Sequence, residues 1–402
     1  MVDMVITILN LAMNMENQMS DFLSDIRMKA LVLHQGFRMT DSAQNAIGSG
    51  YLLKRRVYSN YDDSNFLLEA VPPEIVFPKS GIVATAILKN SSPLVVDYQE
   101  GRFLIYNEET DSEKTEVNFL KRPPFYGKRI SNGNLVESYV TKLFGHSLGI
   151  FAKTGCLFAR QGKVCKFCSI SANQGRPKDI CRNADVSAIL EAVEKAVILD
   201  DSINDVFISG GVGTDDFDEN FVFYSDLAIA IKEKLISLKK SVEVTLNTYP
   251  PRDLKLIDRL ENTGIAVMIS LETVDDEMRS FICPGKSELF SEIVVDNLLK
   301  KLVSVVGYGR VLTFLIQGIE DDRVILKGVE RLAKMGVCAV VHILHVDPGT
   351  WVSEQNMSVP DPDRILAVAR EASRIYRKYS LNSAVLYGGR SSLDGEYSEQ
   401  VW

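Results

Sequence analysis

The sequence predicts an α/β protein: an open, partial (β/α)6 barrel with a β-rich domain before it and a helix after it. Six strand-like segments alternate with amphipathic segments between residues 144 and 352. Such regular alternation is typical of a parallel sheet with right-handed crossovers. Six units are too few for a closed eight-stranded barrel. The 402 residues suffice for this domain and a smaller one.

The segment before the barrel predicts a β-rich domain over residues 29–143. Short β-branched runs are broken there by turn signals, as in SGIVATAILKNSSPLVVDYQEGRFLIYN. The first strand is expected at KALVLHQGF, and the proline-containing KRPPFYG is expected to link the domain to the barrel. Residues 1–28 contain several methionines and are expected to be an unstructured or non-native start.

The barrel units follow in order. Strands are expected within SLGIFAKT, NDVFISGG, VEVTLNT, IAVMISLE, RVLTFLIQG and VCAVVHILHVD. Helices are expected within residues 185–201, 225–240, 252–264, 290–307 and 321–336, because their apolar residues recur at helical spacing. Gly264 and Gly336 are expected to end two of these helices. A final helix within residues 361–381 and a polar tail complete the chain, residues 353–402.

Composition limits the partners and the compartment. The net charge is −8, from 53 acidic and 45 basic residues that are interspersed, so nucleic acid is not expected to bind. The apolar stretch Met4–Met13 is too short to span a bilayer, and no basic residue precedes it, so neither an anchor nor export is expected. Six cysteines in a long chain fit a reducing compartment, and we expect a cytoplasmic protein.

Three cysteines mark a metal centre. Cys156, Cys165 and Cys168 lie in GCLFARQGKVCKFCSI, directly after the first barrel strand, at the edge where such sheets build their sites. Thiolates are the ligands that iron–sulfur clusters prefer, and three of them leave one iron of a four-iron cluster open for another ligand.

The CKFC segment, with Phe167 before Cys168, resembles the cluster loop of the radical S-adenosylmethionine (radical SAM) superfamily. That family usually has a tighter CxxxCxΦC spacing, with Φ aromatic, whereas here eight residues separate the first two cysteines. The longer gap leaves open whether Cys156 or another thiol, such as Cys181, is the first ligand. The alternative is a zinc-stabilised α/β binding module, but zinc needs four ligands and the nearest histidine, His146, precedes the first strand.

The resemblance implies cofactor contacts at the ends of other strands. Ser209, Gly210 and Gly211 resemble the family's GGE segment, which binds the methionine amino group, with Val212 in place of the glutamate. The resemblance further implies contacts from Ser270, Glu272 and Gly318, with Phe167 in the cysteine loop shielding the cluster. Asn247 is expected to contact the cofactor or substrate, because it lies nearest the carboxyl end of the third strand.

Other polar and sulfur residues are expected to be structural. His342 and His345 lie three apart on the last strand, so they are expected on opposite faces, each hydrogen-bonded. Cys338 is expected to be a buried hydrophobe, whereas Cys283 could face the site. One cluster is therefore expected.

The resemblance implies a radical SAM enzyme with a [4Fe–4S] cluster and S-adenosylmethionine as cofactors. Reductive cleavage would give a 5′-deoxyadenosyl radical that abstracts hydrogen from a substrate. The substrate would be a small molecule or a peptide, and an external donor such as flavodoxin or ferredoxin would supply the electron. The residues do not identify the substrate.

Overall fold

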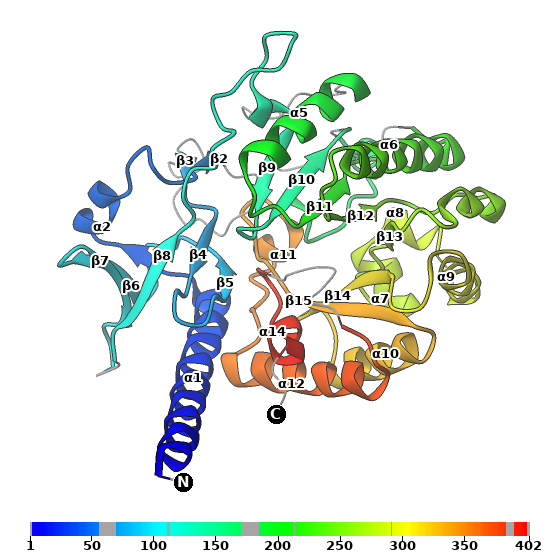
Figure 1. The fold of residues 1–402 in the computed structure, drawn as a ribbon. Helices are drawn as coiled ribbons and strands as arrows, with labels where there is room; N and C mark the ends of the chain where they lie inside the picture. Colours follow the sequence, from blue (N-terminus) through cyan, green and yellow to red (C-terminus); the bar gives the residue numbers. More distant parts are fainter. Residues whose placement is uncertain are drawn as a thin grey trace.

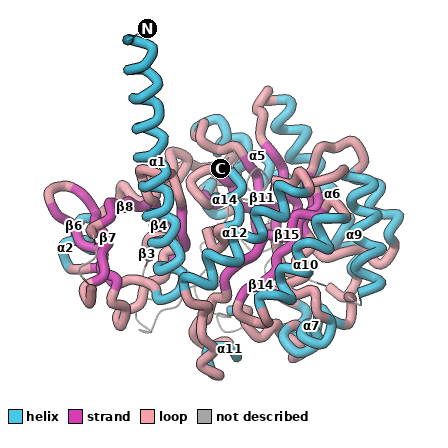
Figure 2. Tube along the Cα trace, turned by 90° about the horizontal axis from the view of Figure 1, so that it is seen from below, coloured by secondary structure: helices cyan, strands magenta, loops and turns pink. Residues whose placement is uncertain are grey.

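The computed structural model describes residues 2–55, 70–110, 113–153, 155–169, 185–212, 214–290, 292–382 and 390–399. Cys181, the alternative first ligand, lies outside these residues. A half-barrel of strands and helices lies beside a smaller β domain, and a long N-terminal helix extends away from both (Figure 1, Figure 2).

The half-barrel is built on a seven-stranded sheet in the order β15-β14-β13-β12-β11-β10-β9. The six predicted strands are confirmed and pair in parallel in sequence order, with β9 antiparallel to β10 at the edge. Because the six strands run the same way, their carboxyl ends share one edge of the sheet. Their bounds are β9 (Val140–Leu143), β10 (Ser147–Phe151), β11 (Asp205–Ser209), β12 (Glu243–Asn247), β13 (Ala266–Met268), β14 (Val311–Gln317) and β15 (Val337–Ile343).

Helices follow the strands as predicted, although one of them, η3, is a 3-10 helix. An aspartate caps the start of five of them by accepting a backbone N–H: Asp185, Asp216, Asp253, Asp321 and Asp361. Their buried faces join the sheet in one hydrophobic core. The helices are α5 (Val186–Leu199), α6 (Phe217–Ser237), η3 (Leu254–Leu260), α9 (Glu292–Val306), α10 (Asp322–Lys334) and α12 (Pro362–Lys378). Among the described residues, no helix combines the length and apolarity needed to cross a bilayer.

The smaller domain contains the expected β structure. Its six-stranded sheet runs β1-β6-β7-β8-β4-β5, and β2 and β3 form a separate pair. The elements are β1 (Arg38–Met39), α2 (Asp41–Ala46), β2 (Lys54–Arg55), β3 (Ala70–Val71), β4 (Glu74–Val76), β5 (Val83–Thr85), β6 (Leu94–Gln99), β7 (Arg102–Asn107) and β8 (Thr115–Phe119), and the 3-10 turn η2 (Val136–Ser138) leads to β9.

The start of the chain corrects two expectations. Helix α1 spans Val2–Gln35, so the strand expected at KALVLHQGF is wrong over its first seven residues, and the start is not unstructured. Phe22, Ile26, Ala30 and Leu33 are buried at helical spacing, and this periodicity continues through the β-branched run. Their burial in the core of the smaller domain outweighs the local strand preference.

The C-terminal residues connect the two parts of the molecule. Thr85 N–H in β5 donates to the Arg390 carbonyl (2.9 Å), and Ile343 N–H in β15 donates to the Ser391 carbonyl (2.8 Å). Helix α14 (Asp394–Glu399) follows, and the Asp394 carboxylate accepts from Val341 N–H (3.2 Å). The polar tail therefore bridges the β domain and the barrel.

A carboxyl group at the start of β11 predicts a pH effect on stability. Burial raises the pKa of Asp205 to about 7, although hydrogen bonds from Ser147 and Thr245 oppose the rise. Because the folded pKa exceeds the unfolded one, this group makes stability fall as pH rises from about 4 to about 7. We expect Asp205→Asn to lessen that fall in urea titrations at pH 5 and pH 8, whereas exposed Asp201→Asn should not. A parallel fall in wild type and Asp205→Asn would contradict the assignment.

Candidate active site

The loop after β10 carries the three cysteines. Cys156 precedes helix α3 (Leu157–Arg160), and Cys168 N–H donates to the Cys165 carbonyl (2.9 Å) in the following turn. Helix α3 occupies the long gap between the first two cysteines. Its Phe158 is buried against Gly285, where a Cβ atom would lie 2.4 Å from the Phe158 ring. The extra residues of the gap therefore form a packed turn.

The first part of this loop is hydrogen-bonded to the loop after β11. Gly211 N–H donates to the Lys153 carbonyl (2.9 Å), and Leu157 N–H donates to the Val212 carbonyl (2.9 Å). The backbones approach so closely that a Cβ atom on Gly211 would lie 1.5 Å from the Gly155 oxygen. Only glycine fits at position 211.

The second part of the loop is held by two further segments. These are the turn between α7 (Asp276–Ile282) and α8 (Pro284–Ser287), and helix α11 (Trp351–Glu354). Lys166 N–H donates to the Ile282 carbonyl (2.8 Å), Gly285 N–H to the Lys163 carbonyl (3.2 Å), and Val352 N–H to the Lys166 carbonyl (3.3 Å). Loops from four strand ends thus meet around the cysteines.

The cysteine side chains are partly exposed, and the pKa of one of them is lowered. A hydrogen bond from the buried Cys283 thiol, with the Lys286 charge nearby, lowers the pKa of Cys165 although burial opposes this. Thiolate is the form that binds metal. Within the described parts of the chain, no three Cys, His, Asp or Glu side chains converge on a single metal position. A four-iron cluster takes one thiolate at each iron, so its cysteines do not meet at one point.

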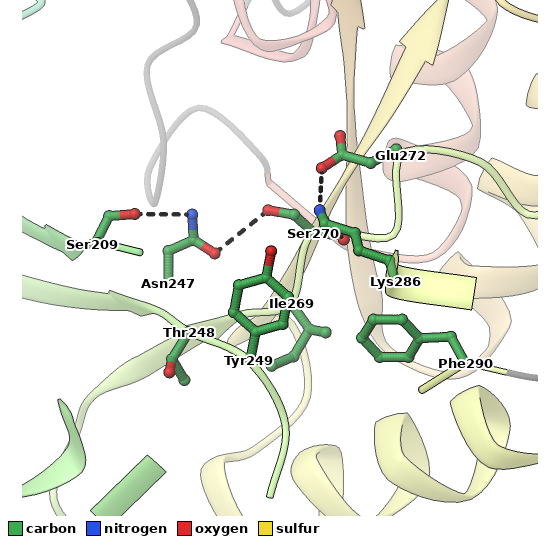
Figure 3. Close-up of a pocket in the computed structure, with 10 residues that line it drawn as sticks. Ser209, Asn247, Thr248, Tyr249, Ile269, Ser270, Glu272, Lys286 and Phe290 are labelled. Carbon is green, nitrogen blue, oxygen red and sulfur yellow. Dashed lines mark hydrogen bonds and ion pairs between the residues drawn. The ribbon is translucent and has the colours of Figure 1, made fainter. Parts of the chain in front are cut away.

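A polar cavity of about 130 Å³ lies beside the loop (Figure 3). Five of the predicted cofactor residues line it: Ser209, Gly210, Asn247, Ser270 and Glu272. The others are Thr248, Tyr249, Ile269, Lys286 and Phe290. We call this space the cofactor cavity.

Hydrogen bonds connect three neighbouring strand ends across this cavity. Asn247 Nδ2 donates to Ser209 Oγ (3.4 Å), and Ser270 Oγ donates to Asn247 Oδ1 (3.3 Å) (Figure 3). Asn247 ends β12, between Ser209 at the end of β11 and Ser270 just after β13. The parallel register therefore gathers hydroxyl and amide groups that are far apart in sequence.

A buried ion pair lies at the other end of the cavity. Lys286 Nζ donates to the Glu272 carboxylate and to the Ser270 carbonyl (3.0 Å). Burial disfavours the Lys286 charge, but Glu272 and the nearby Tyr249 and Cys165 outweigh it and raise the Lys286 pKa well above its usual range. Glu272 adopts a left-handed backbone (φ 69°), a strained conformation for a non-glycine residue.

Two predicted cofactor residues line neither the cofactor cavity nor the larger cavity that lies next to it. Gly211 packs against the cysteine loop, and Gly318 (φ 110°) packs against Leu344 and Pro360. Conversely, Tyr249 and Lys286 line the cofactor cavity but were not among the predicted contacts. The sequence signal that could have pointed to Lys286 is its place directly after Gly285, in the segment that follows the fourth barrel strand.

A larger cavity of about 310 Å³ lies next to the first one. Asn247 and Glu272 line both, and Phe167 and Cys168 face the larger one. His342 and His345 both line it as well, so the expectation of opposite faces is wrong, because β15 ends at Ile343 and strand alternation stops there. The remaining lining residues are Thr85, Leu143, Phe144, Phe151, Ser169, Phe207, Phe314, Ile316, Ile343, Leu344, Asp347, Arg390 and Ser391.

Comparisons with known proteins found one family model and several similar proteins. The model of the radical SAM superfamily matches residues 153–350. Bacteriochlorophyllide c C-7(1)-hydroxylase from Chlorobaculum limnaeum is 24% identical over 262 residues, which cover 62% of this chain and 65% of that protein, just under two thirds. A radical SAM methyltransferase from Sphaerobacter thermophilus aligns at 15% identity and a TM-score of 0.42, over 72% of this chain and 76% of its own. Methylornithine synthase aligns at 14% identity and a TM-score of 0.42, over 58% and 63%.

Residues 153–350 form a radical SAM domain. The matched region begins at the end of β10 and ends just before α11, so it contains the cysteine loop and all the residues of the cofactor cavity. Members of this superfamily use a [4Fe–4S] cluster and S-adenosylmethionine, as the sequence predicts.

The ion pair in the cofactor cavity predicts strong energetic coupling. Removing either partner leaves a buried charge, so Lys286→Met or Glu272→Gln should lower the unfolding free energy by about 3–5 kcal/mol. The double variant should lose much less than the sum of the two, as measured by urea denaturation. Breaking the exposed Lys163–Glu288 pair should cost at most about 1 kcal/mol. Additive losses at Lys286 and Glu272 would show that the pair is not coupled.

Proposed function

We propose that the chain cleaves S-adenosylmethionine reductively and uses the resulting 5′-deoxyadenosyl radical to abstract hydrogen from a substrate. The observation that carries this proposal is the cofactor cavity, whose lining comes from three successive strand ends beside the cysteine loop. When held by the cysteine loop and the cofactor cavity, the cluster would supply the electron and S-adenosylmethionine would supply the radical. The protein's own residues bind, orient and enclose them.

Cys156, Cys165 and Cys168 are the proposed cluster ligands. Two supports are the hydrogen-bonded loop, which holds their backbone in place, and the lowered pKa of Cys165. Phe167 lies between two of the ligands and lines the larger cavity, where its ring would limit water access to the cluster.

The cofactor cavity offers groups that match the polar parts of S-adenosylmethionine. Asn247 can donate and accept, and with the hydroxyls of Ser209 and Ser270 it suits ribose hydroxyls. The Lys286 ammonium and the Glu272 carboxylate suit the carboxylate and ammonium groups of the methionine part. Backbone groups at Gly210 add further contacts, while Gly211 and Gly318 are proposed to position the surrounding loops.

The substrate is proposed to be a small organic molecule. The similarity to a hydroxylase that acts on bacteriochlorophyllide c favours this over a peptide. The electron is proposed to come from an external donor such as flavodoxin or ferredoxin.

Anaerobic reconstitution with iron and sulfide tests the proposal. The protein should bind about four iron atoms per chain, and with dithionite and S-adenosylmethionine it should release 5′-deoxyadenosine. Colourless protein with stoichiometric zinc and no 5′-deoxyadenosine would instead support the zinc-stabilised binding module.

The ligand assignment predicts different effects for two cysteines. Cys165→Ala should lose the cluster absorbance and at least about 100-fold of the 5′-deoxyadenosine rate, because one iron loses its thiolate. Cys338→Ala is the matched control: Cys338 is buried in β15 and acts as a small hydrophobe, so this variant should keep both properties. Retained cleavage in Cys165→Ala would refute the assignment.

A further inference from the structure

The larger cavity is in the right place to hold the substrate. It shares Asn247 and Glu272 with the cofactor cavity, and Phe167 and Cys168 of the cysteine loop form part of its wall. A molecule bound here would lie next to S-adenosylmethionine. The chemistry of this wall therefore indicates what kind of molecule the enzyme takes.

Most of the inner wall is apolar and aromatic. Five phenylalanines line the cavity: Phe144, Phe151, Phe167, Phe207 and Phe314. The His342 ring lies 4.1 Å from the Phe314 ring, centroid to centroid. Burial lowers the His342 pKa to about 3, so this ring is neutral near pH 7. Such a wall favours a hydrophobic, aromatic body over a charged one.

Among the described lining residues is one arginine, Arg390, which directly precedes Ser391 in the cavity wall. Arg390 Nη1 donates to Glu74 Oε1 (3.1 Å), and the guanidinium lies 5.4 Å from the centre of the Phe144 ring. Glu74 is fully buried, and its other oxygen accepts from Phe144 N–H (3.1 Å). The buried carboxylate of Glu74 therefore holds Arg390 on one side. The guanidinium has five N–H donors, and this hydrogen bond uses one of them.

The segment that carries Arg390 is fixed on both sides. Besides its backbone hydrogen bonds to β5 and β15, this segment makes side-chain hydrogen bonds. Ser391 Oγ lies 2.8 Å from Thr85 Oγ1 and 2.8 Å from His345 Nε2. Since binding gains affinity when groups are already ordered, a fixed guanidinium suits recognition of a planar anion.

We propose that this cavity binds a substrate with an aromatic body and a carboxylate, and that Arg390 binds the carboxylate. The β domain and the C-terminal segment then select the substrate, while the barrel performs the chemistry. This inference rests on the proposed function, since it assumes that the larger cavity faces the radical.

Paired probes test the carboxylate without needing the natural substrate. Binding of 1-naphthaleneacetate and of its uncharged amide, 1-naphthaleneacetamide, is measured by isothermal titration calorimetry on the full chain under anaerobic conditions. Wild type should bind the acid more tightly than the amide. Arg390→Gln should weaken acid binding about tenfold or more and leave amide binding within about threefold.

Two further variants keep the test decisive. Arg390→Gln leaves Glu74 buried and unpaired, so Glu74→Gln/Arg390→Gln, which neutralises both partners, is measured beside it and should lose the same preference. Arg374→Gln, an exposed change on α12, should keep it. Equal binding of acid and amide by wild type, no binding of either, or an equal loss of both in the variants would overturn the proposal.

The two proposals fail separately. Formation of 5′-deoxyadenosine without any preference for the acid would refute the carboxylate site alone. A preference that depends on Arg390, without any 5′-deoxyadenosine, would refute the radical chemistry and leave the binding assignment standing.

Discussion

The site depends on the backbone hydrogen bonds that fix the cysteine loop to its neighbours. The loop is bonded to the segment after β11, to the turn between α7 and α8, and to α11. Each of these segments follows a different parallel strand, so the contacts exist only when the sheet has its native order. Gly211 and Gly285 allow the closest approaches, where a side chain would overlap the opposing atoms. The fold therefore positions the proposed metal ligands through main-chain geometry.

Charged side chains lie next to the cysteine loop. The buried Lys286–Glu272 pair and the left-handed backbone of Glu272 place a cation and an anion beside the loop, at a cost in desolvation and strain. Such costs are common at functional sites, where they hold groups in the orientation that a ligand needs. A second ion pair joins the partly exposed Arg390, which lines the larger cavity, to the buried Glu74. Each of the two cavities is thus lined by a member of an ion pair.

The sequence predicted the parts of the site that depend on local pattern. Strand and helix periodicity located the six barrel strands, and this located the cysteine loop at the correct edge. It did not predict α1, because a β-branched run hid a helical spacing that begins further upstream. The sequence pattern also gave no role to Arg390. Arg390 and its hydrogen-bond partner in β5 are about three hundred residues apart in the chain, and only folding brings them together.

Three cysteines are proposed to hold a four-iron cluster with one iron open to S-adenosylmethionine. Electron paramagnetic resonance of the dithionite-reduced protein tests this most directly, recorded with and without S-adenosylmethionine. A [4Fe–4S] signal that changes on addition of S-adenosylmethionine, and couples to a ¹⁵N label in its amino group, is the predicted result. A signal that S-adenosylmethionine leaves unchanged, or a cluster with four protein thiolates, would contradict the account.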